Sequence, residues 1–100
     1  DIIMGNDDYI YISGATGSDF ILAKIYPGNG IASWISTSES TGMSGGGMGI
    51  CQGSDGSIYQ GGTLDNKWAV LRYNSYGNLL WYTQYESVHS DGDWFPVVRF

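Results

Sequence analysis

The side chains best suited to chemistry gather in one polar stretch late in the sequence. His89, Asp91 and Asp93 lie close together, and Trp94 follows directly. The two carboxylates could offer oxygen ligands to Ca²⁺, but a calcium loop needs more such ligands, so we expect an ordinary turn and no metal. His89 could act as a general base. No nucleophile partnered with it can be identified, so we predict that the chain is not an enzyme.

An aromatic ring beside acidic and amide side chains is instead typical of sugar recognition. A neutral carbohydrate needs an aromatic platform and hydrogen-bonding groups without strong charge. Trp94 supplies the ring, and two other loops are expected to add polar groups. The predicted ligand-binding residues are Trp94, Asp91, Asp93, His89, Asp65, Asn66 and Asp19. These residue types favour lectin-like binding of a glycan, without a cofactor.

Two further features offer less chemistry. Cys51 is the only cysteine, so the chain can form neither an intrachain disulfide nor a multi-cysteine metal motif. The residues before it read as a strand, so we expect a buried, inert thiol. The glycine-rich run 42–49 lacks the spacing and the lysine of a phosphate-binding loop. We interpret that run as a flexible linker between two structural units.

The composition excludes several classes of partner. The net charge is −6, with only four Lys and Arg residues among 100. Binding to nucleic acid needs clustered cations that displace counterions, and docking on an anionic membrane needs the same. No apolar run of 18 residues occurs, so we predict no membrane insertion. Sixteen glycines and an aromatic content of 15% indicate one small all-β domain.

The chain repeats itself. Shifted by 48 residues, positions 2–24 fall on positions 50–72 with many matches. The matching pairs include Ile2 with Ile50, Gly5 with Gly53, Asp7 with Asp55, Tyr11 with Tyr59, and Lys24 with Arg72. Beyond Lys24 the shift falls to 47, so that Trp34 matches Trp81. The change of one residue lies in the turn 26–30, where length varies at little cost.

A period near 48 with four short strands in each unit is typical of a β-propeller blade. The strands are expected at residues 2–4, 9–14, 20–26 and 31–37, then at 48–52, 57–62, 67–73 and 79–85. Residues 1–47 would form one four-stranded blade, 48–95 a second, and 96–100 the start of a third inner strand. We expect Trp34 and Trp81 to fill the space between blades. A two-sheet sandwich with weak internal symmetry is the alternative.

Two stretches carry a resemblance to a known family. ICQGSDGSIYQGGT at 50–63 and WAVLRYNSYGNLLW at 68–81 resemble the repeats of bacterial and archaeal secreted or cell-surface β-propellers. They are also similar to quinoprotein-type propeller repeats. The first copy departs from the pattern, because Asp8 replaces the turn glycine. The resemblance implies an extracellular or cell-surface location and transfers no catalytic residue. A purely structural or adhesion scaffold is the alternative function, and a quinoprotein-like enzyme is a distant third.

The repeat also implies a partner. A blade buries its two faces only against other blades, and about four to eight blades are needed to close a ring. Two-blade chains are therefore expected to form cyclic homo-oligomers. Three chains would give six blades and four would give eight, and we favour the trimer.

Overall fold

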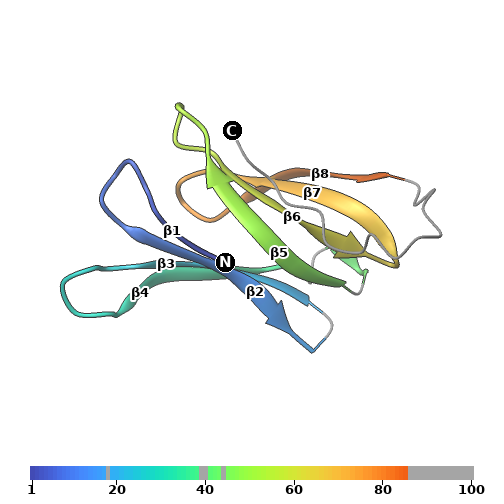
Figure 1. Ribbon diagram of the computed structural model, residues 1–100, viewed down its shortest axis with the longest axis horizontal. Helices are drawn as coiled ribbons and strands as arrows, with labels where there is room; N and C mark the ends of the chain where they lie inside the picture. The colour runs from blue at the N-terminus through green and yellow to red at the C-terminus, as the bar shows by residue number, and fades with distance from the viewer. Residues whose placement is uncertain (18, 39–40, 44, 86–100) are drawn as a thin grey trace.

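The computed structural model describes residues 1–17, 19–38, 41–43 and 45–85 (Figure 1). This part of the protein is all-β, with eight strands in two antiparallel four-stranded sheets. No helix in it is long and apolar enough to cross a membrane. The prediction of an all-β fold is therefore confirmed, and the described residues form two sheets of four strands each. The expected third inner strand at 96–100 lies outside the described residues.

Each sheet is built from four consecutive strands. The first sheet contains β1 (Ile2–Met4), β2 (Ile10–Thr16), β3 (Asp19–Ile25) and β4 (Ala32–Thr37). The second contains β5 (Gly45–Gln52), β6 (Ile58–Leu64), β7 (Lys67–Tyr73) and β8 (Leu79–Tyr85). β-Branched and aromatic residues fill these runs because they pack well on a pleated surface. The predicted bounds are confirmed for β1, β7 and β8, and the other strands differ by a few residues at their ends.

The two sheets share two local features as well as their order of strands. The register shifts between Lys24 and Ile25 where β3 meets β4, and between Arg72 and Tyr73 where β7 meets β8. Asp8 adopts a left-handed φ of 66°, and Gly56 at the matching position has φ 87°. The departure at Asp8 therefore leaves the turn unchanged in shape. The sequence repeat is a structural repeat.

The glycine-rich run was expected to be a linker, and this expectation is wrong from Gly45 onward. Gly45 pairs with Leu64 and Gly46 with Thr63 at the start of β5. A Cβ atom on Gly45 would collide with the carbonyl oxygen of Thr63. A Cβ on Gly46 would lie 3.0 Å from the Cβ of Ala15 in the first sheet. These glycines are strand residues because two backbones approach closely there.

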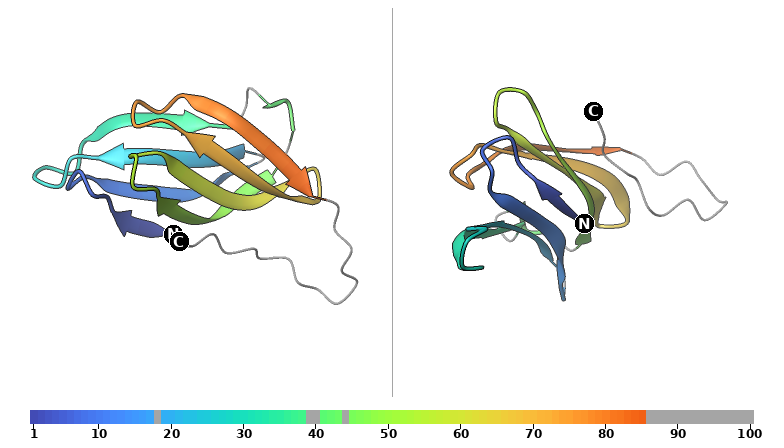
Figure 2. Two further views of the ribbon diagram at one scale, coloured as in Figure 1. Left: turned by 90° about the horizontal axis from the view of Figure 1, so that it is seen from above. Right: turned by 60° about the vertical axis from the view of Figure 1, so that its left-hand side comes forward.

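The sheets stack as two layers, and the core lies between them (Figures 1 and 2). β2 and β3 of the first sheet pack against β5 of the second. Each sheet buries one face, as period-two alternation requires. The buried core consists of Tyr11, Phe20, Leu22, Ile50, Ile58, Leu64, Ala69, Leu71 and Tyr73.

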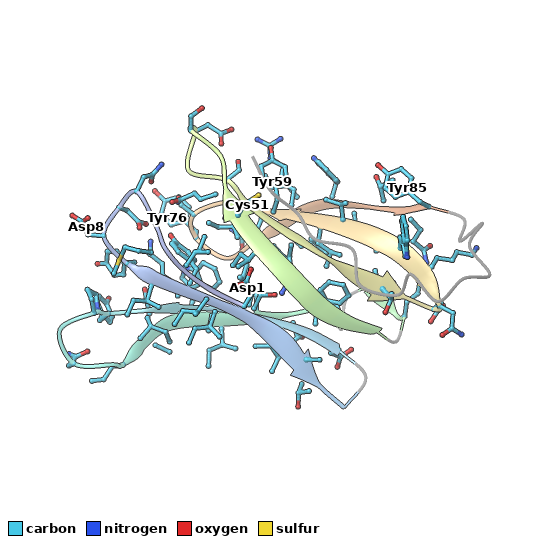
Figure 3. All side chains as sticks on the ribbon, viewed as in Figure 1. Asp1, Asp8, Cys51, Tyr59, Tyr76 and Tyr85 are labelled. Carbon is cyan, nitrogen blue, oxygen red and sulfur yellow. The ribbon has the colours of Figure 1, made fainter. Side chains whose placement is uncertain are left out.

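The two faces that meet in this core are not equivalent in the repeat. Across the first sheet the inward row is Ile3, Tyr11, Lys24 and Trp34. Its repeat counterparts are Cys51, Tyr59, Arg72 and Trp81, which form a row across the second sheet. That second row points away from the first sheet, and the label of Tyr59 in Figure 3 marks this side. The side of the first sheet that carries Tyr11 therefore contacts the side of the second sheet opposite to Tyr59. We call this arrangement head-to-tail stacking, because each sheet uses a different side for the contact.

The two tryptophans consequently differ in their surroundings. Trp34 packs against the core, with its ring centroid 6.2 Å from that of Tyr11. Its Nε1 donates a hydrogen bond of 3.2 Å to the Ser75 carbonyl in the turn between β7 and β8. Trp34 thus lies between the sheets, as predicted. Trp81 does not: it lies on the outward side of the second sheet with 41% of its surface exposed.

Candidate functional site

The sequence-predicted sugar site is described only in part. Asp65 and Asn66 form the turn between β6 and β7. Their φ values of 49° and 65° are those of a two-residue hairpin turn. Asp19 begins β3 and pairs with Thr16. All three lie at the same end of the sheets (Figure 1). The other four predicted residues, His89, Asp91, Asp93 and Trp94, lie outside the described residues.

A pocket lies at the opposite end, beside the turn between β5 and β6. It has a volume of about 430 Å³. Its lining residues are Gln52, Gly53, Ser54, Asp55 and Tyr59, which we call the corner pocket. The lining combines an amide, a hydroxyl, a carboxylate and a phenol. Such a set can hydrogen-bond to a polar ligand while one ring provides apolar contact.

The carboxylate of the corner pocket is held in place by two neighbours. Asp55 Oδ1 accepts a hydrogen bond of 2.9 Å from the amide of Ser57. Its Oδ2 forms a 3.0 Å ion pair with Nη2 of Arg72, which also donates to the Ser57 hydroxyl at 2.9 Å. The hydrogen bonds from Ser57, followed by the charge of Arg72, lower the pKa of Asp55. The pocket therefore carries a fixed negative charge whose field is partly balanced by Arg72.

An aromatic cluster extends from the corner pocket across the outward side of the second sheet. The ring centroids of Tyr59 and Trp81 lie 6.3 Å apart at an interplanar angle of 59°. The guanidinium carbon of Arg72 lies 5.6 Å from the centre of the Tyr59 ring. This is cation–π geometry. The pocket thus opens beside two aromatic rings that are tilted against each other.

The first repeat holds the same constellation in a buried setting. The Tyr11 hydroxyl donates a 2.6 Å hydrogen bond to Asp7 Oδ2, and Lys24 Nζ lies 3.1 Å from that oxygen. Burial, reinforced by the hydrogen bond to Asp7, raises the pKa of Tyr11. Burial also tends to raise the pKa of Asp7, but hydrogen bonds from Tyr11 and Tyr9 and the charge of Lys24 lower it overall. Because these three side chains lie inside the protein, we interpret their role as structural.

The corner of the first repeat is closed by the second sheet. The amide of Asn6 donates a 2.6 Å hydrogen bond to Oε1 of Gln52. A Cβ on Gly5 would come within 2.9 Å of the same oxygen. Gln52 therefore fills the corner beside Tyr11, which matches the corner pocket beside Tyr59. The repeat counterpart of Gln52 is Met4, whose side chain is exposed.

Sequence reasoning missed the corner pocket, although its residues carried a signal. The matches of Asp7 with Asp55, Tyr11 with Tyr59, and Lys24 with Arg72 were visible in the repeat. Nothing in the sequence alone said that one copy would be buried and the other open. Within the described ranges, no group of three or more His, Cys, Asp or Glu residues could hold a metal ion. A scan against protein-family models and searches of curated proteins and of solved structures gave no match to this chain.

Proposed function

We propose that the protein is a structural repeat module of the β-propeller kind, whose sheets stack on further sheets of the same type. The observation that carries this proposal is the head-to-tail stacking of the two sheets. In an isologous contact both partners use the same surface, and the contact is then complete. In a heterologous contact each unit keeps its second surface for the next unit. Two sheets stacked in this way leave one uncovered surface of each of the two kinds, one on each sheet.

The outward side of the first sheet supports this proposal. It presents a row of apolar side chains from all four strands: Ile2, Ile12, Ala23 and Ile35. Ile2 is 63% exposed and Ile35 is 62% exposed. A contiguous apolar surface of this kind on a folded domain marks an interaction site. We call this surface, together with Met4, the first outward face.

The connectivity favours blades over an immunoglobulin-like sandwich. Among the described residues, each sheet uses four strands in chain order, and no strand is exchanged between the two sheets. In such sandwiches the chain crosses repeatedly from one sheet to the other. We therefore propose a closed ring of blades made from several copies, with the trimer favoured, in an extracellular or cell-surface setting. The location follows the family resemblance alone.

The mass of the particle in solution tests this proposal. Sedimentation velocity across a wide range of concentrations should give a species of a small whole multiple of 10.9 kDa. Three chains are expected for a six-bladed ring. The far-ultraviolet circular dichroism should report β structure in the same samples. A folded particle that stays at 10.9 kDa at the highest concentration would overturn the proposed function.

The corner pocket favours a second candidate function, the binding of a neutral carbohydrate. Tyr59 offers a ring, and Ser54 and Asp55 offer hydrogen-bonding groups around about 430 Å³. Titration calorimetry with neutral mono- and oligosaccharides should then give saturable binding. Tyr59→Ala should abolish it, whereas Tyr76→Ala, which removes an exposed ring from the turn between β7 and β8, should leave it unchanged. No heat from any neutral sugar would exclude this function.

A further inference from the structure

The geometry points to one occupant for both outward sides: we infer that the outward side of the second sheet binds the first outward face of another copy of this chain. In that contact Met4 of the second copy enters the corner pocket, and Trp81 covers the turn between β3 and β4. The inference rests on the proposed function and adds the partner and its contacts. We call the residues Cys51, Tyr59, Arg72 and Trp81, with the corner pocket, the second outward face.

The argument begins from the interface already present inside the chain. There the indole of Trp34 covers the turn between β7 and β8. The contact is so close that a Cβ on Gly77 would lie 2.7 Å from the indole. The hydroxyl of Ser36 donates a 2.5 Å hydrogen bond to the carbonyl of Gly77. The tryptophan can thus approach the turn closely because Gly77 has no side chain. The two outward faces continue this interface by one repeat in each direction.

The counterparts of these residues lie on the two outward faces. Trp81 matches Trp34, and Gly30 matches Gly77. Gly30 has φ 73°, close to the 86° of Gly77, so the two turns present the glycine in the same conformation. Around Gly30 the described residues place no heavy atom within 4 Å of a Cβ position. Trp81 of one copy can therefore cover Gly30 of another as Trp34 covers Gly77.

The corner pocket fits the same arrangement. In the internal interface Gln52 fills the corner beside Tyr11, and the amide of Asn6 donates to it. In the inferred interface Met4 takes the place of Gln52, and the corner pocket beside Tyr59 is the place it fills. An unbranched thioether adapts to an irregular space and packs well on an aromatic ring. Met4 is 63% exposed, so it is available to a second copy.

A polar pair in the internal interface is replaced by an apolar pair in the inferred one. Gln60 Nε2 donates a 2.8 Å hydrogen bond to the Ser13 hydroxyl between the sheets. The repeat counterparts are Ile12 for Gln60 and Gly61 for Ser13. Both partners have changed together, so the new contact leaves no polar side chain unpaired at this point. A glycine opposite an isoleucine also provides room for the larger side chain.

Cross-linking of two cysteine variants tests the contact directly. One chain carries Met4→Cys and the other Ser54→Cys, both in a Cys51→Ser background. When they are mixed under oxidising conditions, the disulfide-linked heterodimer should form at least about tenfold faster than from a control mixture of Thr16→Cys with Ser54→Cys. Thr16 is exposed at the opposite end of the sheets. Equal rates in the two mixtures, with assembly intact, would overturn the inference and leave the proposed function standing.

A substitution on the second outward face gives an independent measurement. Trp81→Ala should raise the dissociation constant of the assembly by about 30-fold, as a buried aromatic anchor does. The matched control is Tyr82→Ala, because Tyr82 has the same 41% exposure on the same strand and points to the opposite side. Circular dichroism verifies that both variants fold. Equal effects of the two substitutions would refute the inference, whereas a wild-type chain that never assembles would refute the proposed function itself.

Discussion

Gln60 and Ser13 are joined by a 2.8 Å hydrogen bond that crosses from the second sheet to the first. The same amide nitrogen donates to the carbonyl of Ile21 at 2.7 Å. Gln60 is fully buried, so its amide depends on these partners rather than on water. The pair therefore fixes how the two sheets lie on each other.

A double-mutant cycle should measure this pair. Ser13→Ala leaves the Gln60 amide with fewer partners and should lower the free energy of unfolding by about 1 kcal/mol. Gln60→Ala should cost about 2–3 kcal/mol because it also opens a cavity. Urea denaturation of both single variants and of the double variant should give a coupling of about 1 kcal/mol. A coupling of zero would mean that the hydrogen bond does not stabilise the stack.

Two glycines at matching positions should respond differently to a methyl group. A Cβ on Gly62 would collide with the carbonyl oxygen of Gly46 and lie 2.7 Å from Cζ of Phe20. Gly62→Ala should therefore lower the free energy of unfolding by about 3 kcal/mol. Gly14→Ala, the matched control, meets no described heavy atom within 4 Å and should change it by less than about 1 kcal/mol. Urea midpoints of dilute samples compare the two, and equal losses would contradict the head-to-tail stack.

The acid stability of the protein should depend on Asp7. Because the folded state lowers the pKa of Asp7 below 3.8, the carboxylate stabilises the fold fully at pH values above this. That contribution is lost as the pH falls through 3.8 and then through the lower folded value. Asp7→Asn should thus destabilise the protein at pH 7 by about 1–2 kcal/mol. It should also make the loss of stability with falling pH, which we call the acid limb, less steep.

The second repeat provides the control for this pH dependence. Asp55→Asn removes the matching carboxylate, which is exposed. We expect it to change the urea midpoint at pH 7 less than Asp7→Asn does, since water screens an exposed ion pair. The measurement is the urea midpoint between pH 2 and pH 7 for both variants. A steeper acid limb in Asp7→Asn than in the wild type would contradict the role given to Asp7.

Two buried tyrosines should also differ on loss of their hydroxyls. The Tyr73 hydroxyl has no hydrogen-bond partner among the described residues, and burial raises its pKa to about 12. Tyr73→Phe should leave the free energy of unfolding unchanged or raise it by about 1 kcal/mol. Tyr11→Phe should lower it by about 1–2 kcal/mol, because it removes the 2.6 Å bond to Asp7. Thermal denaturation separates the two cases, and a loss in Tyr73→Phe would reveal a polar partner.

Much of the fold could be predicted from the sequence because its signals are local. β-Branched and aromatic runs between turn residues gave the eight strands, and the bounds of β7 and β8 were predicted without error. The one-residue change of shift was placed in the turn after Lys24. In the structure six residues separate β3 from β4 and five separate β7 from β8, which agrees with it. Gly45 and Gly46 misled the prediction, because only the tertiary approach of Thr63 and Ala15 explains glycine in a strand.

The candidate site could not be predicted in the same way. Tyr11 and Tyr59 occupy matching positions in the repeat, yet one is fully buried and the other lines a pocket. What separates them is which side of each sheet faces the other, and this depends on the sum of many contacts between layers. Asp65 and Asn66 were selected for their polar side chains. In the structure their positive φ values accommodate a tight turn, a role that composition alone does not distinguish from ligand binding.

The head-to-tail order of the sheets has a consequence for growth in length. The two sides of each sheet form the two different surfaces of the contact, so any added copy brings both surfaces with it. A tandem duplication of the coding segment would therefore extend the row without a single new contact having to arise. Placing copies on separate chains or on one long chain changes only the covalent links between them. The architecture is modular, and in a closed ring the angle between neighbouring sheets sets how many copies are needed.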